Sequence, residues 1–186
     1  MILLLQYTLI FASVLMLVAL GGCFAERSGV INIGLEGIMV IGGLMGVVMI
    51  NILNNAGVPT ALGIVLTILA AGVAGLAYSS LLAFSAVNLK ADQTIGGTAL
   101  NLLATALAIV VAKRINGNDS PKIAYNSNSN PVLNNLHFSF NVGPLTLNWF
   151  LLVTAIAVAL AWFILYRSRF GMRLMACGEH PQAAAS

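Results

Sequence analysis

Charged residues are scarce in this chain. Only 7% of its 186 residues are Asp, Glu, Lys or Arg, whereas 60% are hydrophobic and the mean hydropathy is +0.98. A soluble domain averages about 25% charged residues, so eight basic and five acidic side chains are too few to cover a surface that faces water. Proline and cysteine are also few, with 5 and 2 residues, which excludes collagen-like and disulfide-scaffold proteins. The composition predicts an integral membrane protein.

A basic surface interleaved with aromatic residues is missing as well, although the net charge is +3 and the sequence pI is about 9.1. The basic residues are scattered at the ends of apolar segments and have no aromatic residues clustered among them, so we expect no nucleic-acid partner. Basic residues in such places usually orient a membrane protein. The two cysteines, Cys23 and Cys177, fit no metal or redox spacing, so we expect them to be ordinary small apolar side chains.

Signals of catalysis are lacking too. The sequence has no Gly-x-Ser-x-Gly motif, and its histidines, His137 and His180, lie outside the long apolar segments. A phosphate-binding loop needs Gly-Lys followed by Ser or Thr, but the residues before the three lysines are Leu89, Ala112 and Pro121. We therefore expect no enzyme activity, no cofactor and no metal site. If the chain takes part in active transport, another polypeptide must hydrolyse the ATP.

Long apolar segments are abundant. A membrane-spanning helix needs about 20 mostly apolar residues, and the segments of this kind predict an all-α fold, a polytopic transmembrane helical bundle of about five spans. Glycines interrupt the second and fourth spans. The first segment is predicted to be a span rather than a cleaved signal peptide, because it lacks a basic start and is followed by another apolar segment. The five segments are residues 1–25, 29–53, 60–87, 94–112 and 149–166.

The sequence between the spans predicts the domains and the orientation. Residues 1–166 form the membrane region, residues 113–148 a long Asn-rich loop within it, and residues 167–186 a tail that is basic at first. Cytoplasmic loops are enriched in Lys and Arg, so we expect the tail in the cytoplasm, the loop outside the cell, and the chain in the cytoplasmic membrane. The basic residues on the tail side are Arg27, Lys90, Arg167, Arg169 and Arg173, and those on the loop side are Lys113, Arg114 and Lys122.

Two of the spans contain polar side chains that are costly to bury. An ionisable group within a span costs about 2.5–3.5 kcal/mol, and Glu36 lies seven residues beyond Gly29, about 10 Å along a helix. The run 29–37 has three glycines and is predicted to be poorly helical, and a similar polar run begins the fourth span. Non-helical backbone at membrane depth is tolerated where it lines a cavity. The candidate pathway residues are Asn32, Glu36, Asp92, Gln93 and Asn101.

A structural role for the same residues stays open. Glu36 could pair with Arg27 or with a backbone group, and each amide could form only an interhelical hydrogen bond. We favour that structural role for Asn101, whose neighbours are apolar. Small residues spaced four apart, Gly42 with Gly46 and Ala71 with Gly75, predict close helix packing.

The tail combines a basic start with a short motif. By its residues alone it is best interpreted as a basic anchor with a frayed end, although Pro181 could begin a small helix. Its last part is Gly178-Glu179-His180-Pro181-Gln182-Ala183-Ala184. Together with residues 21–37 and 91–102, residues 166–184 resemble the permease subunits of bacterial ABC importers of the nucleoside and simple-sugar type, related to ribose and branched-chain amino-acid permeases.

This resemblance implies function, partners and a coupling site. The tail is similar to the family's cytoplasmic coupling loop, Gly-Glu-x-Pro-x-Ala-Ala. The implied partners are a second permease subunit, a cytoplasmic ABC ATPase and an external solute-binding lipoprotein, and the implied small-molecule solute is a nucleoside. Because such permeases are longer, we expect the chain to be an N-terminal portion that stops within the loop. The implied contacts with the ATPase are Gly178, Glu179, Pro181, Ala183 and Ala184.

Other functions remain as alternatives. The solute could be a simple sugar or a branched-chain amino acid, because amide and carboxylate groups serve all three. A non-transporting membrane scaffold would use only the helix-packing residues. An intramembrane enzyme would have Glu36 and Asp92 as its only candidate carboxylates, with no nucleophile or metal ligand nearby in sequence.

Overall fold

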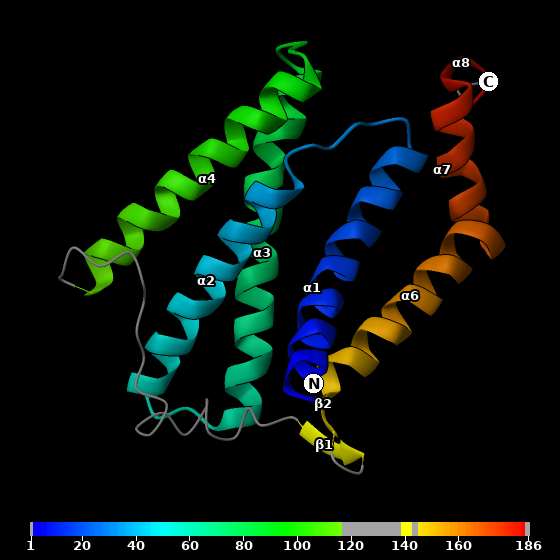
Figure 1. The fold of residues 1–186 in the computed structure, drawn as a ribbon. Coiled ribbons are helices and arrows are strands. Elements are labelled where there is room, and N and C mark those ends of the chain that lie inside the picture. The colour runs from blue at the N-terminus through cyan, green and yellow to red at the C-terminus, as the bar shows by residue number, and fades with distance from the viewer. Residues whose placement is uncertain (1, 117–138, 143–144, 185–186) are drawn as a thin grey trace. The chain divides into compact units, whose positions relative to one another are not determined.

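Each apolar segment forms a helix long enough to cross a membrane. The computed structural model describes residues 2–116, 139–142 and 145–184, and within them the five predicted spans are confirmed. These are α1 (Ile2–Arg27), α2 (Leu35–Asn55), α3 (Thr60–Val87), α4 (Gln93–Asn116) and α6 (Trp149–Arg167) (Figure 1). The remaining elements are β1 (Ser139–Val142), β2 (Leu145–Asn148), α7 (Arg169–Glu179) and α8 (Pro181–Ala184).

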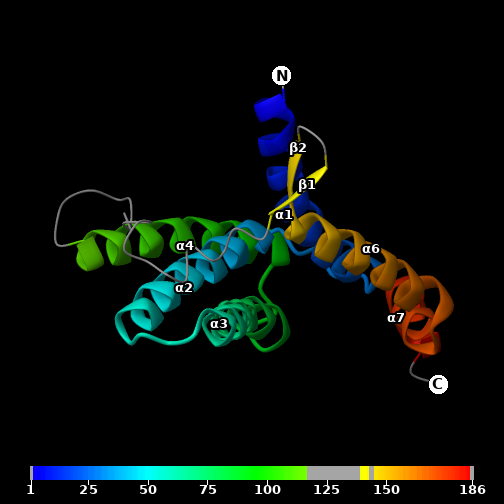
Figure 2. The same cartoon turned by 90° about the horizontal axis from the view of Figure 1, so that it is seen from below.

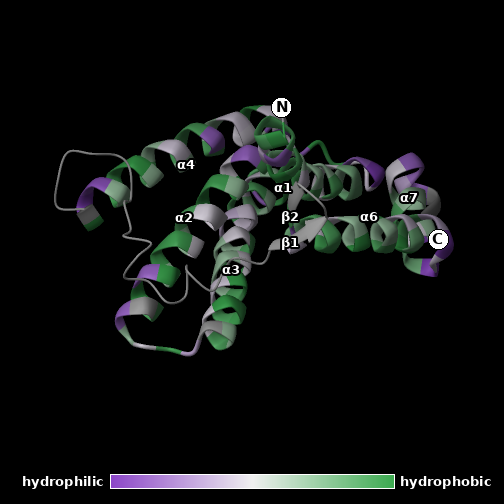
Figure 3. Ribbon diagram, turned by 60° about the horizontal axis from the view of Figure 1, so that its bottom comes forward, coloured by the Kyte–Doolittle hydropathy of each residue, from purple (hydrophilic) through white to green (hydrophobic). Residues whose placement is uncertain are grey.

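The surface of the spanning helices is apolar. Large side chains such as Leu76, Leu102 and Phe11 are 71%, 75% and 67% exposed, and hydrophobic colour covers most of the length of these helices (Figure 3). A helix that is apolar on all sides is typical of a membrane span. The fold is therefore that of a multi-pass membrane protein whose exposed surface is suited to lipid.

Two predicted boundaries differ from the structure. The second helix begins at Leu35 rather than Gly29, and the fourth continues to Asn116, beyond the expected start of the loop. Lys113 and Arg114 lie in the last turn of α4, where cations interact favourably with the helix dipole. Residues 117–138 of the predicted loop lie outside the described residues, and its last part forms an antiparallel hairpin that pairs Ser139 with Asn148.

The chain divides into two compact units. The first contains residues 1–32 and 137–186, so that α1 packs with α6, the hairpin and α7. Ser13 and Thr154 are each only 1% exposed at the contact between α1 and α6. Their hydroxyls donate to the carbonyls of Ile10 at 2.7 Å and Phe150 at 2.9 Å in their own helices. Small side chains that are satisfied in this way allow the two helices to approach closely.

The second unit, residues 33–136, contains α2, α3 and α4. Helix α2 packs against both of the others and lies between them when α3 is seen nearly end-on (Figure 2). A Cβ atom added at Gly42 would lie 3.5 Å from the carbonyl oxygen of Ala71, and one at Gly46 would lie 3.8 Å from the Ala71 Cβ. The predicted close packing of these small residues is confirmed.

The tail is more regular than the residues alone indicated. The expected frayed end is wrong, because residues 169–179 form α7 and Pro181 begins α8. The Ser168 hydroxyl accepts a hydrogen bond from the Gly171 N–H at 3.1 Å, which caps the start of α7. Arg169 and Arg173 are exposed on this helix. An amphipathic helix, rather than a frayed segment, therefore follows α6.

Candidate functional site

The chain leaves α1 through a glycine turn. Residues 28–34 are not helical, as predicted for the first part of the run 29–37. The Gly29 N–H donates to the Glu26 carbonyl at 3.0 Å and the Val30 N–H to the Ala25 carbonyl at 3.1 Å, which is the bond pair of a Schellman cap. Gly29 has a φ of +80°, a conformation that other residues adopt reluctantly. The end of α1 is therefore closed by its own chain.

Asn101 of α4 holds the beginning of α2. Its Oδ1 accepts from the Gly37 N–H at 2.8 Å, and its Nδ2 donates to the Ile33 carbonyl at 2.9 Å. The N–H groups in the first turn of a helix have no partner within that helix, and here a side chain from another span supplies one. The structural role favoured for Asn101, an interhelical hydrogen bond, is confirmed.

Backbones approach closely at the same place. A Cβ added at Gly97 would lie 2.9 Å from the Gly34 nitrogen and 3.2 Å from the Ile33 Cβ, and one at Gly37 would lie 2.9 Å from the Asn101 Oδ1. No side chain fits at either position without displacing its neighbours. We call this contact, formed by Ile33, Gly34, Gly37, Gly97 and Asn101, the α2–α4 junction.

Helix α3 stabilises the α2–α4 junction through a hydrogen bond to α4. Tyr78 is buried, and its hydroxyl donates to the Leu100 carbonyl at 2.6 Å. Leu100 directly precedes Asn101, so this bond fixes the part of α4 from which Asn101 extends. A buried tyrosine usually satisfies its hydroxyl in this way.

Glu36 lies at a helix end. We expected it well inside a span, but α2 begins at Leu35, so Glu36 is in the first turn and exposed. The count of about 10 Å along a helix from Gly29 does not apply, because residues 28–34 are not helical. A carboxylate in the first turn is stabilised by the positive end of the helix dipole.

Asp92 caps α4. Its Oδ1 accepts from the N–H of Thr94 at 2.7 Å and of Ile95 at 3.3 Å. These hydrogen bonds, first of all the one from Thr94, hold the pKa of the exposed Asp92 carboxyl below its usual value because they favour the charged form. Gln93 is the first residue of α4 and is half-buried.

Asn32 differs from the other four candidates. Its Oδ1 is buried and has no hydrogen-bond partner among the described residues. A buried polar atom without a partner is uncommon in folded proteins. The structure thus leaves a buried side-chain acceptor on the non-helical segment unsatisfied within the described part of the chain.

The residues predicted to contact an ATPase lie where α7 ends and α8 begins. Gly178 and Glu179 end α7, and Pro181 is the first residue of α8, where its missing N–H is harmless. Glu179 and Pro181 are exposed, so their side chains are accessible to a partner. Ala183 and Ala184 also belong to α8.

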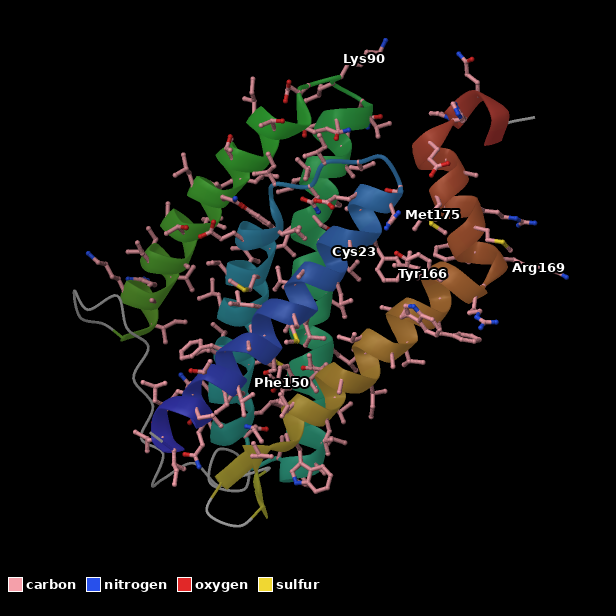
Figure 4. The ribbon with its side chains drawn as sticks, turned by 45° about the vertical axis from the view of Figure 1, so that its right-hand side comes forward. Cys23, Lys90, Phe150, Tyr166, Arg169 and Met175 are labelled. Carbon is pink, nitrogen blue, oxygen red and sulfur yellow. The ribbon has the colours of Figure 1, made fainter. Side chains whose placement is uncertain are left out.

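The end of α1 is fixed to α6 and to α7. The Arg27 Nη2 donates to the Tyr166 hydroxyl at 3.0 Å, and the guanidinium carbon lies 5.7 Å from the centre of the Tyr166 ring. Figure 4 shows Tyr166 directed toward this end of α1. A Cβ added at Gly178 would lie 2.5 Å from the Arg27 carbonyl oxygen and 3.0 Å from the Gly29 nitrogen. Backbone therefore meets backbone between α7 and the cap of α1.

Sequence reasoning missed several of these residues. Gly97 lies in the polar run that begins the fourth span. Its spacing of four from Asn101 places both residues on one face of the helix, which could have identified it. Tyr78 and Tyr166 gave no signal, because aromatic residues are common in spans and at their ends. Within the part of the chain that the structure describes, no group of three or more His, Cys, Asp or Glu residues could hold a metal ion.

Five apolar helices, a non-helical segment held by another span, and a capped amphipathic helix define a multi-pass membrane protein with a polar junction. The family model described as branched-chain amino acid transport system / permease component matches residues 4–186. The chain belongs to this family.

Curated relatives extend the comparison. The chain is 40% identical over 190 residues to the guanosine ABC transporter permease protein NupQ of Bacillus subtilis (strain 168), and 38% identical over 186 residues to the nucleoside ABC transporter permease protein NupC of Lactococcus lactis subsp. cremoris (strain MG1363). Both alignments cover 95% of this chain and 56% of the relative.

A third relative is more distant. The putative glucose ABC transporter permease protein TsgC13 of Haloferax volcanii is 33% identical over 192 residues, which cover 97% of this chain and 53% of that protein. The chain thus spans about half the length of the curated relatives it matches. No solved structure matches the chain.

Proposed function

We propose that this chain is part of a permease subunit of an ATP-driven ABC importer that moves nucleosides across the cytoplasmic membrane. The similarity to two permeases named for guanosine and nucleoside transport, along 95% of the chain, is the observation that carries the proposal. The exposed apolar surface of the five spans supports a role within the bilayer.

The proposed importer contains three kinds of partner, one within the membrane and one on each side of it. A second permease subunit encloses the solute pathway, a cytoplasmic ABC ATPase binds the segment from Gly178 to Ala184, and an external lipoprotein delivers solute. The exposure of Glu179 and Pro181 at the turn between α7 and α8 supports the ATPase contact. The tail then lies in the cytoplasm.

Within the pathway, we assign solute contact first to Asn32. Its buried, unpartnered Oδ1 can accept a hydrogen bond from a hydroxyl or amino group, and nucleosides have both. Glu36 and Gln93 remain further candidates. Asp92 and Asn101 already use their polar atoms to cap helices.

A sugar is the second candidate solute, because one relative is a putative glucose permease. The test is uptake by the full-length subunit, assembled with its ATPase and binding protein, of labelled guanosine, glucose and leucine. We expect ATP-dependent uptake of guanosine that unlabelled nucleosides inhibit. Uptake of glucose or leucine in its place would reassign the solute, and no uptake of any kind, with no copurifying ATPase, would favour a membrane scaffold.

The coupling role has its own variants. Glu179→Lys reverses the charge at the end of α7, and Pro181→Leu removes the fixed backbone angle that starts α8. We expect either change to lower uptake about tenfold while membrane insertion is unchanged. A factor of this size is typical of the loss of coupling between two sites. Normal uptake by both variants would count against the ATPase contact.

A further inference from the structure

Two glycines from opposite ends of the sequence touch in the first unit. A Cβ added at Gly29 would lie 3.0 Å from the Gly178 Cα and 3.4 Å from its carbonyl oxygen. In the reverse direction, a Cβ added at Gly178 would lie 2.5 Å from the Arg27 carbonyl oxygen and 3.1 Å from the Ser28 carbonyl carbon. A side chain at Gly178 would require the backbone of α1 to shift, and one at Gly29 would make an unusually tight contact with Gly178.

The contact is formed by main-chain atoms on both sides. The end of a long side chain can rotate away from a displaced neighbour, but main-chain atoms move only with the chain that contains them. On one side the backbone is held by the Schellman bonds of Gly29 and Val30, and on the other by the last turn of α7, where the His180 N–H donates to the Ala176 carbonyl at 3.0 Å. A shift of the end of α7 toward α1 must therefore displace the cap of α1.

The two partners of this contact adjoin the proposed coupling and pathway residues. Gly178 directly precedes Glu179, which we assign to the ATPase contact. Gly29 opens the non-helical segment, and Asn32 follows it three positions later with its unpartnered oxygen. The Arg27 hydrogen bond to Tyr166 at 3.0 Å also connects the same end of α1 to α6, which restrains movement of the cap.

We propose that the Gly29–Gly178 contact transmits movement of the coupling segment to residues 28–32, and that both glycines are positioning residues for transport. This inference rests on the proposed function. It assigns to the first helix a part in coupling that the motif in the tail does not itself contain.

The experiment compares two glycines that both have a positive φ. Asn tolerates a positive φ better than most residues, so Gly29→Asn limits backbone strain but introduces a Cβ against Gly178. Gly57→Asn is the matched control, because Gly57 has a φ of +65° and a Cβ there meets nothing within 4 Å. Gly178→Ala tests the contact from its other side. All are made in the full-length subunit within the assembled transporter.

We expect Gly29→Asn to lower the ratio of solute taken up to ATP hydrolysed about tenfold, while basal ATP hydrolysis and copurification of the ATPase stay at the wild-type level. Gly57→Asn should keep the wild-type ratio. The double variant with Gly178→Ala should lose little more than either single variant, since both disturb one contact. A merely structural role would lower uptake and hydrolysis together and leave their ratio unchanged, and that result would overturn the proposal.

A measurement on the wild-type transporter covers the case in which the variants do not insert. Amide hydrogen exchange of residues 28–32 should change about tenfold between the nucleotide-free and nucleotide-trapped states, together with that of residues 178–184. A change confined to residues 178–184 would overturn the inference alone. A wild-type transporter without ATP-driven uptake of any solute would overturn the proposed function and this inference with it.

Discussion

At the scale of single residues, the structure separates polar side chains that the sequence groups together. Asn32 and Asn101 have the same chemistry, yet Asn101 bonds through both atoms of its amide, whereas the Asn32 oxygen has no partner among the described residues. Asp92 uses its carboxylate as a helix cap. Burial cost alone therefore identifies residues that need a partner, but not which partner they have.

The loss of the Asn101 amide should destabilise the second unit. Asn101→Leu leaves the Gly37 N–H and the Ile33 carbonyl without their partners, at a cost of about 1–3 kcal/mol. Asn51→Leu on α2 is the control, because Asn51 forms no hydrogen bond with the described part of the chain. Thermal unfolding in detergent micelles should show a lower Tm for Asn101→Leu only. Equal Tm values for both variants would contradict the role of Asn101.

Asp92 should make the start of α4 sensitive to acid. Because hydrogen bonds lower its pKa in the folded state, its stabilising contribution is complete above about pH 4, the ordinary Asp range, and is lost as the pH falls through the lowered value. Asp92→Asn keeps a capping oxygen that does not titrate. The wild-type Tm should therefore fall more than the variant Tm between about pH 6 and about pH 3. Parallel curves would refute the capping assignment.

At the scale of helices, composition predicts that a helix exists better than it predicts the residues at which the helix begins and ends. Five spans follow from apolar length, and the glycines from Gly29 onward predict that the helix is interrupted. The start of α2 at Leu35 depends on Asn101, 64 positions away from Gly37. No local pattern contains that information, which is why counting residues from Gly29 did not place Glu36 in the first turn of α2.

The approach of α4 to the start of α2 should tolerate no side chain at Gly97. Gly97→Ala directs a Cβ at the Gly34 nitrogen, 2.9 Å away, whereas Gly96→Ala meets the Leu82 Cδ1 and the Ser85 Oγ at 3.4 Å, which these side chains can relieve by small movements. We expect Gly97→Ala to cost about 1–3 kcal/mol as an overpacking change, with little loss for Gly96→Ala. Thermal unfolding of the two variants side by side makes the comparison, and a greater loss for Gly96→Ala would show that the junction is not the tighter contact.

At the scale of the whole molecule, the sequence predicted a membrane protein and, through a resemblance, its family. It did not predict the contact between the cap of α1 and Gly178, because residues 29 and 178 approach only after the first and last described spans pack together. Orientation stays a prediction from the count of Lys and Arg.

That orientation can be measured with the exposed Cys177. In a Cys23→Ala background, a membrane-impermeant maleimide should label Cys177 only in inverted vesicles, because the tail is expected in the cytoplasm. Lys113→Cys, in a chain that also has Cys177→Ala, should label in intact cells. The reverse pattern would invert the topology.

The two units also differ in how they are made on the ribosome. Residues 33–136 form an uninterrupted stretch, whereas the other unit joins residues 1–32 to residues 137–186. During synthesis α1 emerges before the other described helices, and α6 and α7 are translated more than a hundred residues later, so α1 enters the bilayer before these partners exist. Of the described helices, the one that is synthesised first is thus among the last to pack against its partners in the same unit.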